Sequence, residues 1–375
     1  MHAKRAPQPS QRLRLMNKYI IANSVCQKQS KFGSTSYNPG RMGHETFDLL
    51  HAIDAALAIR KSLLNESSYS ALRLFNGFTE GCPDLVVDLY ARTLVVFDYS
   101  ARPQSVEDWK FLFVWYQSQI PWLESGMLKS RASDDLALRR GVLCFGSHLA
   151  DRICENGIWY ALNLNMNQDA SLYLDTRMLR AWLFENAAGK DVLNTFAYTG
   201  SLGIAAAAGG AHKVISSDLN RRFLELARRS AQLNQIPENH HRLQVGDFFS
   251  QVASFKHSGT LFDIVISDPP FFSSTSKGQV QLVGQSRRII NKLRPLVRDG
   301  GFLISINNAL FVSGTDYLNE LNDLCKDGYL SLEEILPVPQ DFIGRSTSAA
   351  VWPADPAPFN HPTKIAVLRV RRKTA

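Results

Sequence analysis

The chain has 375 residues, 45% of them hydrophobic, which is enough to bury sizeable cores in two or three domains. Its longest uncharged apolar run, residues 202–211, is far shorter than the roughly 20 residues that a membrane-spanning helix needs. The sequence therefore predicts a soluble protein. The net charge is +8, from 42 Lys and Arg against 34 Asp and Glu, and favours a polyanionic partner such as RNA.

The positive charge is concentrated at the N-terminus. Residues 1–44 contain eight Lys or Arg and no Asp or Glu, so they account for the whole excess. We expect a disordered leader, which is either an RNA-binding tail of a cytoplasmic protein or an organelle transit peptide. The five cysteines form no Cys-x-x-Cys pair, which indicates a reducing compartment and no zinc site.

Residues 45–165 are expected to form a small α+β domain that presents the substrate. Apolar residues at helical spacing predict a helix over 45–68, and short apolar runs predict strands over 73–78, 85–90 and 93–99. A second helix is predicted over 109–120 and a hairpin over 153–165. The rest of the chain, residues 166–375, is assigned to a cofactor-binding catalytic domain.

Four short apolar runs, separated by segments of helix length, follow in residues 190–268. This alternation predicts βαβ units and an α/β fold with a Rossmann-like, mostly parallel sheet. Later runs over 302–308 and 364–370 predict two further strands, the last as the antiparallel C-terminal partner. In such sheets ligands bind beyond the carboxyl ends of the strands, where Asp218, Asp247 and Asp268 fall.

A glycine turn follows the first of these runs. Gly200 and Gly203 open a helix, but Tyr198 stands where a dinucleotide fingerprint has its first glycine, which argues against NAD or FAD. Asp218, at the end of the next strand, is placed to accept two ribose hydroxyls, although alone it could equally be a strand-end or helix-capping acid. A ribose acid without a phosphate fingerprint suggests S-adenosylmethionine, with Asp247 and Phe248 beside the adenine.

The most specific motif is Asp268-Pro269-Pro270-Phe271. Two prolines directly after a core strand cannot continue the ladder, so they hold the Asp side chain rigidly at the edge of the sheet. An acid beside Phe271 or Phe272 suits a flat heteroaromatic substrate, because the acid accepts a ring N–H or amine hydrogen while the aromatic side chain stacks on the ring.

The segment from about residue 73 to residue 370 resembles the class I S-adenosylmethionine-dependent methyltransferases that modify bases of large-subunit ribosomal RNA, the carbon-5 cytosine and N7 guanine group. The resemblance lies in residues 173–177, 193–200, 217–219, 231–234, 246–248 and 268–271. It implies a pocket for the cofactor and the target base, with Asp175 and Arg177 packing over the cofactor. The cofactor residues are then Tyr173, Asp175, Arg177, Asn194, Phe196, Tyr198, Gly200, Asp218, Leu219, Asp247, Phe248 and Asp268.

The target atom is inferred from a missing thiol. Carbon-5 methylation needs a cysteine nucleophile, and relatives that carry one have it where this chain has Asn307-Asn308. The Ser-x-Asn-Asn ending and Gln340-Asp341-Phe342-x-x-Arg345 resemble the guanine N7 branch. We therefore expect direct transfer to nitrogen, with Asp268, Pro269, Pro270, Phe271 and Asn307 as the catalytic residues. A carbon-5 enzyme, a small-molecule or protein methyltransferase, and a non-catalytic RNA-binding scaffold remain alternatives.

Two further segments near this motif have polar or basic sequences. Residues 273–277 predict a polar loop that contacts phosphate or is simply mobile. Residues 281–297 predict a helix with four basic residues, followed directly by Arg298, and its basic face either is solvated or contacts an RNA backbone. The pair His240-His241 is expected in a solvent-exposed loop.

Overall fold

The computed structural model describes residues 39–64, 69–101, 105–270, 272–275, 278–281, 286–344 and 354–372. Of the predictions above, those for residues 1–38, Phe271, Lys277 and Arg345 lie outside the described residues. Residues 39–44, which we had included in the leader, instead begin the first described helix, α2 (Pro39–Arg60). No helix in the described part is long and apolar enough to cross a membrane.

The first half of the chain forms a five-stranded sheet in the order β1-β2-β3-β4-β5, in which only the β3–β4 pair is parallel. A separate hairpin, β6–β7, follows it. The elements after α2 are η2 (Lys61–Leu63), β1 (Ala71–Asn76), α3 (Gly77–Glu80), β2 (Leu85–Tyr90), β3 (Thr93–Asp98), α4 (Lys110–Gln119), β4 (Ser125–Ser130), α5 (Leu136–Arg140), β5 (Val142–Phe145), β6 (Arg152–Glu155) and β7 (Ile158–Ala161).

The second half forms a seven-stranded sheet in the order β10-β9-β8-β11-β14-β16-β15. Its first five strands are parallel, and β16 runs antiparallel to both β14 and β15, which confirms the Rossmann-like fold with an antiparallel C-terminal pair. Its elements are α6 (Arg177–Asn186), β8 (Asp191–Thr195), α7 (Ser201–Ala208), β9 (Lys213–Asp218), α8 (Arg221–Leu233), β10 (His241–Val245), α9 (Phe248–His257), β11 (Phe262–Ser267), β12 (Phe272–Thr275), β13 (Gly278–Gln281), α10 (Ser286–Leu293), η3 (Arg294–Leu296), β14 (Val297–Asn307), α11 (Gly314–Cys325), β15 (Leu330–Leu336), α12 (Gln340–Ile343) and β16 (Lys364–Val370).

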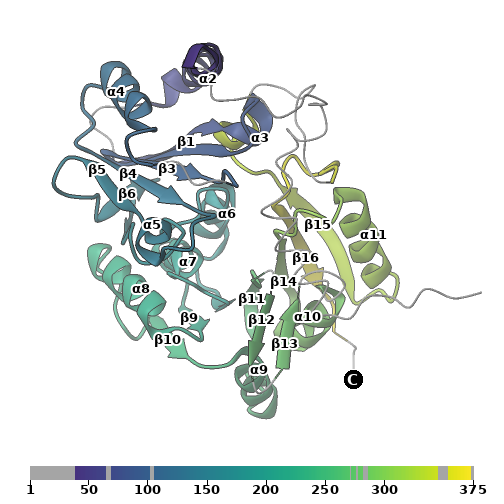
Figure 1. The fold of residues 1–375 in the computed structure, drawn as a ribbon. Helices are drawn as coiled ribbons and strands as arrows, with labels where there is room; N and C mark the ends of the chain where they lie inside the picture. The colour runs from purple at the N-terminus through teal and green to yellow at the C-terminus, as the bar shows by residue number, and fades with distance from the viewer. Residues whose placement is uncertain are drawn as a thin grey trace, which may run out of the picture.

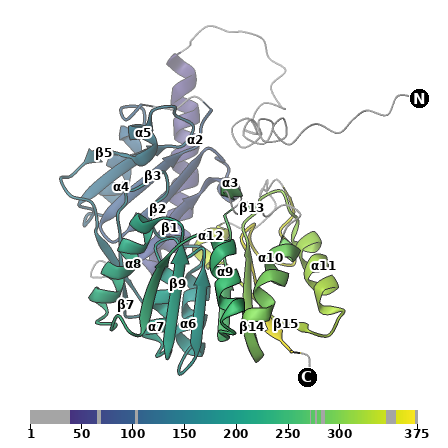
Figure 2. The same cartoon turned by 90° about the horizontal axis from the view of Figure 1, so that it is seen from below.

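Alternate apolar residues of the parallel strands build a layer on each face of this sheet. Val192 and Ile264 belong to the cluster that includes α6 and α7 residues, whereas Leu193 and Val265 belong to the cluster that includes α10 and α11 residues. Figures 1 and 2 show these helices on opposite sides of the sheet. The strand order reverses at β8, and ligands of such folds bind at the carboxyl ends of the strands beside that point.

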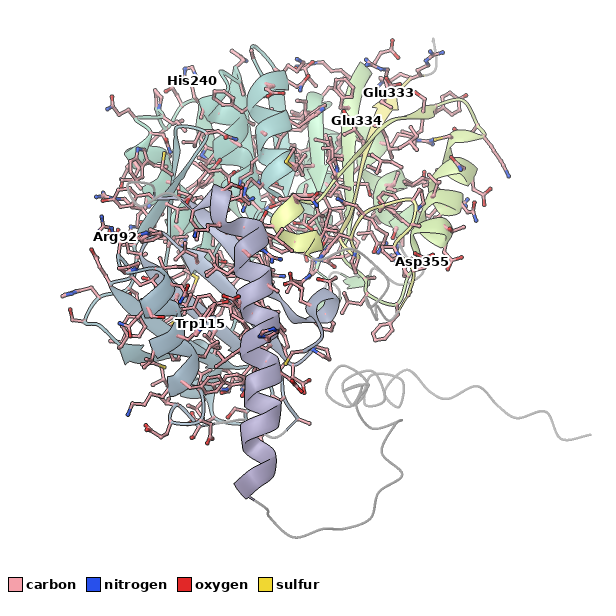
Figure 3. The ribbon with its side chains drawn as sticks, turned by 90° about the horizontal axis from the view of Figure 1, so that it is seen from above. Arg92, Trp115, His240, Glu333, Glu334 and Asp355 are labelled. Carbon is pink, nitrogen blue, oxygen red and sulfur yellow. The ribbon has the colours of Figure 1, made fainter. Side chains whose placement is uncertain are left out.

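The two halves share a core. One face of the five-stranded sheet is covered by α2 and α4, and its other face belongs to the same cluster as the β6–β7 hairpin and α6. In Figure 3, Arg92 and Trp115 mark the part with the smaller sheet, and Glu333 and Glu334 mark the far side of the large sheet, on its edge strand β15.

A buried ionic network at the junction includes the short helix α12, which lies against β1. Asp341 of α12 is fully buried and accepts from Arg177 of α6 at 2.8 Å and from the backbone N–H of Arg73 at 2.9 Å. Arg60 of α2 donates to the Asp341 carbonyl at 2.7 Å and pairs with Glu80 at 2.8 Å. Segments more than 260 residues apart in sequence are therefore fixed to one another.

Three predicted local structures differ from the observed ones. Residues 272–275 pair with residues 278–281 as a hairpin, although a polar loop was predicted. The predicted helix over 281–297 is shorter, because Pro295 follows α10 in a 3₁₀ turn and the chain then enters β14. His241 is buried in β10, where it shares a 2.8 Å hydrogen bond with Ser216, rather than lying exposed in a loop.

Candidate active site at the carboxyl ends of the strands

A cavity of about 540 Å³ lies where the parallel strands of the large sheet end. This volume is within the usual range for small-molecule and cofactor sites. Its described lining residues are Asn167, Asp169, Tyr173, Asp175, Thr176, Phe196, Tyr198, Ser217, Asp218, Leu219, Asn220, Phe223, Gly246, Asp247, Phe248, Phe249, Asp268, Pro269, Pro270, Ile306, Asn308 and Thr363.

Asp218 is oriented by backbone donors. It ends β9, and its two carboxylate oxygens accept from the N–H of Tyr198 at 2.9 Å and the N–H of Asn220 at 2.8 Å. Each oxygen keeps a second lone pair, so the carboxylate can also accept two hydroxyl groups from a ligand. Burial raises the pKa of Asp218 above its ordinary value, and the N–H donors oppose that shift.

The loop from β8 to α7 has an unusual backbone conformation. Phe196 and Tyr198 have φ of 53° and 51°, in the left-handed region that bulky residues rarely adopt, and Gly200 has φ of 78°. Strained backbone of this kind is often found at ligand sites. The conformation directs the Tyr198 N–H to Asp218 and leaves the side chains of Phe196 and Tyr198 in the cavity wall.

Aromatic rings form much of the remaining wall. Phe196 stacks on Phe248 with ring centroids 4.5 Å apart, and Tyr198 lies 5.2 Å from Tyr173. Asp247 caps the N-terminus of α9 by accepting from the Ser250 N–H at 3.1 Å. Aromatic side chains beside an acid suit a flat ring with polar edges, such as adenine.

Asp268 lies at the end of β11 and lines the same cavity, together with Pro269 and Pro270. Burial, with a smaller contribution from the charge of Asp175, raises the pKa of Asp268 to about 7. Asp175 itself accepts from the Thr363 hydroxyl at 2.7 Å, on the segment that leads into β16. The cavity wall thus includes both Asp218, the candidate for binding a sugar, and Asp268 with the two prolines that follow it.

Four predicted site residues are not among the lining residues. Arg177 instead pairs with Asp341 and Glu155 at the junction, and Asn194 is buried beside Gly203 under the loop. A Cβ on Gly200 would come within 2.5 Å of the Ala227 Cβ, so this glycine permits α7 to approach α8 rather than a ligand. Asn307 is buried, and its side chain donates to Ser286 and accepts from the Ala309 N–H.

Asn308, rather than Asn307, lines the cavity. The prediction also missed several lining residues, because they come from segments without a distinctive motif. Asn220 and Phe223 could have been found from their position just after Asp218, and Asn167 and Asp169 from their position just before Tyr173. Phe249, next to the predicted Phe248, also lines the cavity.

The cavity is strongly acidic. Five carboxylates line it, and its described lining includes no Lys, Arg or His; the acids are Asp169, Asp175, Asp218, Asp247 and Asp268. Such a site repels phosphate groups, which disfavours dinucleotides, and attracts a cation. S-adenosylmethionine fits this lining, because it combines an adenosine with a cationic sulfur and an ammonium group and lacks phosphate.

Cysteines and metal clusters are not found in this site. Cys82, Cys144, Cys154 and Cys325 lie outside the described lining, and Cys26 lies outside the described residues. Within the same described ranges, no group of three or more His, Cys, Asp or Glu could hold a metal ion.

Comparison with known proteins gives a consistent family. Residues 136–351 match the family described as S-adenosylmethionine-dependent methyltransferases. The chain is 30% identical over 277 residues to ribosomal RNA large subunit methyltransferase I of Shewanella amazonensis, covering 70% of this chain and 69% of that protein. It is 27% identical over 325 residues to the protein of the same name in Aliivibrio fischeri, covering 83% and 80%.

Solved structures support the fold. A methyltransferase crystallised in complex with SAH superposes with a TM-score of 0.74 at 22% identity, covering 90% of this chain and 83% of that one. The sequence match spans more than half of the chain and includes the strands, the β8–α7 loop and the Asp-Pro-Pro edge that build the cavity. The protein therefore belongs to the S-adenosylmethionine-dependent methyltransferases.

Proposed function

We propose that this enzyme methylates a nitrogen of an RNA base, with ribosomal RNA as substrate and guanine N7 as the first candidate atom. The observation that carries the proposal is that Asp218 and Asp268 line one cavity. Asp218, which is suited to bind a sugar, and Asp268, which is suited to bind a heteroaromatic ring, then face the same cavity. The names of the relatives from Shewanella amazonensis and Aliivibrio fischeri support ribosomal RNA as the substrate class and the compartment of ribosomes, the cytoplasm in bacteria, as the location.

The cofactor end of the cavity is assigned to residues near β9 and β10. When bound, S-adenosylmethionine supplies an electrophilic methyl group on a cationic sulfur. Asp218, held by two backbone N–H groups, accepts the ribose hydroxyls, and hydrogen bonds to a charged acceptor contribute roughly 1.5–3 kcal/mol each. Leu219 and Phe248 contact the adenine, and Asp247 accepts from its amino group.

The acceptor end is assigned to Asp268, Pro269, Pro270 and Asn308. Asp268 accepts a hydrogen bond from the edge of the target base, and the prolines fix its position because they cannot rotate about φ. Asn308 takes the role that the sequence suggested for Asn307, since its side chain is the one in the lining. Holding the reacting atoms in line is the main requirement for this type of transfer.

The two candidate nitrogen targets, guanine N7 first and an exocyclic amine second, place different demands on Asp268. Transfer to ring nitrogen 7 of guanine uses a free lone pair and requires no proton acceptor. Transfer to an exocyclic amine releases one proton, which Asp268 in its ionised form can accept. A carbon-5 mechanism needs a thiolate at the target base, and the absence of cysteine from the described lining supports the nitrogen proposal.

The test is methyl transfer to defined acceptors, read by nucleoside mass spectrometry. Purified protein is incubated with radiolabelled S-adenosylmethionine and either unmodified large-subunit ribosomal RNA, total cell protein or a metabolite extract. We expect label in RNA and a methylated purine, with 7-methylguanine first. Label found only as 5-methylcytosine would refute the nitrogen target, and label confined to protein or metabolites would refute the RNA substrate.

A matched control separates catalysis from a scaffold role. Asp218→Ala should abolish methylation and weaken cofactor binding in isothermal titration, whereas a non-catalytic RNA-binding protein would give no cofactor binding in the wild type. Thermal melting of both proteins checks that the variant is folded. The part of the chain that contains the five-stranded sheet is assigned to presenting the RNA, so variants of its exposed residues are expected to change the Michaelis constant for RNA and not the cofactor affinity.

A further inference from the structure

The helices next to the acidic cavity carry basic residues of two kinds. On α10, Arg287 lies 3.4 Å from Asp323, and Arg294, one residue past the helix in η3, lies 2.8 Å from Asp327, so both are ion-paired with the α11 side. Arg288 and Lys292, four residues apart, share another face of α10. Neither of them pairs with a carboxylate in the described part of the chain.

Arg288 and Lys292 converge on one ring. The Arg288 guanidinium lies 5.8 Å and the Lys292 ammonium 5.4 Å from the ring centre of Phe249. Phe249 also lines the cavity, so these two cations are one aromatic side chain away from it. Lys256 of α9 is exposed nearby, and burial together with the charge of Lys292 lowers its pKa.

This arrangement costs stability unless an anion is present. Like charges four residues apart on a helix repel each other, and here no described carboxylate compensates them. The segment before α10, residues 271–285, contains no acidic residue either. The site that they adjoin has five carboxylates and cannot hold phosphate, so an RNA that inserts a base there must have its backbone bound outside.

We propose that Arg288, Lys292 and Lys256 form a phosphate-binding surface on α9 and α10 that holds the RNA backbone next to the base-binding cavity. The inference rests on the proposed RNA substrate. It adds that the RNA strand approaches the cavity from the side of α9 and α10. Phosphate contacts of this type fix the position of the nucleic acid and carry no sequence information. The paired residues Arg287 and Arg294 are excluded from the surface.

The test compares two double variants that change the net charge equally. Arg288→Gln with Lys292→Gln removes the proposed contacts, and Arg287→Gln with Arg294→Gln removes the paired cations. RNA binding and the Michaelis constant for unmodified large-subunit ribosomal RNA, transcribed in vitro, are measured from 50 to 200 mM salt. Cofactor affinity is measured by calorimetry for each protein.

Each lost phosphate contact should reduce the slope of log affinity against log salt by about 0.7–0.9. Two lost contacts therefore predict that the wild type's advantage over the Arg288/Lys292 variant falls roughly 7- to 12-fold between 50 and 200 mM salt. Cofactor affinity should change less than about twofold, and the Arg287/Arg294 control should keep the wild-type slope. Arg288→Lys with Lys292→Arg, which preserves both charges, should restore the wild-type slope.

An unchanged slope in the Arg288/Lys292 variant would overturn the inference, and so would an equal loss in the control, which would indicate a net-charge effect. These results leave the proposed function intact as long as the wild type methylates RNA. If the wild type neither binds nor methylates RNA, both proposals fail.

Discussion

The pKa of Asp268 gives a pH dependence of cofactor binding that can be measured without any RNA. Burial and the charge of Asp175 raise this pKa from 3.8 to about 7. A shift of this size corresponds to at most about 4 kcal/mol of cost for ionising the side chain in the free enzyme. A cationic ligand in the cavity favours the ionised form, so binding below pH 7 must release a proton from Asp268.

The magnitude follows from this ionisation. If only the carboxylate form binds, the apparent dissociation constant rises roughly tenfold for each pH unit below 7 and is nearly flat above pH 8. Calorimetry with S-adenosylmethionine from pH 5.5 to 8.5, in buffers of different ionisation enthalpy, measures both the affinity and the released proton. Asp268→Asn should remove the slope and the proton release. Asp175→Asn should move the inflection to lower pH, because it removes a charge that raises the pKa of Asp268.

The ionisation of Asp268 also changes the free energy of unfolding. The unfolded carboxyl ionises near pH 3.8 and the folded one near 7, so the folded state holds the extra proton between these values. The free energy of unfolding therefore falls as the pH rises through this window, and the whole penalty is present above it. Asp268→Asn should unfold at a higher urea concentration than the wild type at pH 8, with a difference in the free energy of unfolding of at most about 4 kcal/mol.

A wild-type cofactor affinity that is independent of pH, or an Asp268→Asn variant whose affinity still depends on pH, would refute the role of Asp268 in cofactor binding.

Three more predictions concern the site and its support. Asp218→Asn should weaken S-adenosylmethionine binding at least tenfold, because each hydrogen bond to the charged acceptor contributes roughly 1.5–3 kcal/mol; calorimetry measures it, and a change below twofold would contradict the ribose role. Asp341→Ala should lower the free energy of unfolding in urea by about 3–5 kcal/mol, since it removes the buried carboxylate that pairs with Arg177 and accepts from the Arg73 N–H. Glu333→Gln, which removes the partly exposed pair with Arg369, should lower the free energy of unfolding by no more than about 1 kcal/mol. An equal loss in the Asp341 and Glu333 variants would contradict the greater weight given to the buried pair. Gly200→Ala should cost about 1–3 kcal/mol more in urea unfolding than Gly259→Ala, since both have positive φ but only Gly200 faces a neighbour, Ala227; equal effects would show that the contact is unimportant.

The candidate site residues whose place in the cavity wall the sequence indicated include three at strand ends. Asp218, Asp247 and Asp268 each follow an apolar run, and parallel strands bring their carboxyl ends to one edge, so local patterns were sufficient. The direction of a side chain was harder to predict. Alternation at the end of β14 puts Ser305 and Asn307 on one face and Ile306 with the following Asn308 on the other, but it does not show which face meets the cavity. In the structure Asn307 faces Ser286 and Asn308 lines the cavity.

Long-range contacts were beyond sequence reasoning. Arg177 resembled a cofactor residue, but its partner Asp341 lies 164 positions away, in a short helix that no periodicity indicates. The β12–β13 hairpin was missed because its strands are rich in Ser and Gln, which have no strand preference. The Arg177–Asp341 pair is a tertiary interaction for which one sequence contains no signal, whereas the hairpin is a local structure that its composition does not indicate.

The charges of the site constrain how a polyanion can be its substrate. A cavity lined by five carboxylates stabilises the cationic sulfur of the cofactor, and that attraction weakens once the methyl group has left, because the sulfur is then neutral. The same carboxylates repel the phosphates of RNA, so only a neutral base can enter, and it must be turned out of its helix or come from a single strand. Unpaired cations are therefore needed near the opening, and the face of α10 that carries Arg288 and Lys292 has them beside Phe249, a residue of the cavity wall. An acidic interior that favours the cationic cofactor and excludes phosphate, with a basic exterior that holds the backbone, gives both preferences a common electrostatic basis.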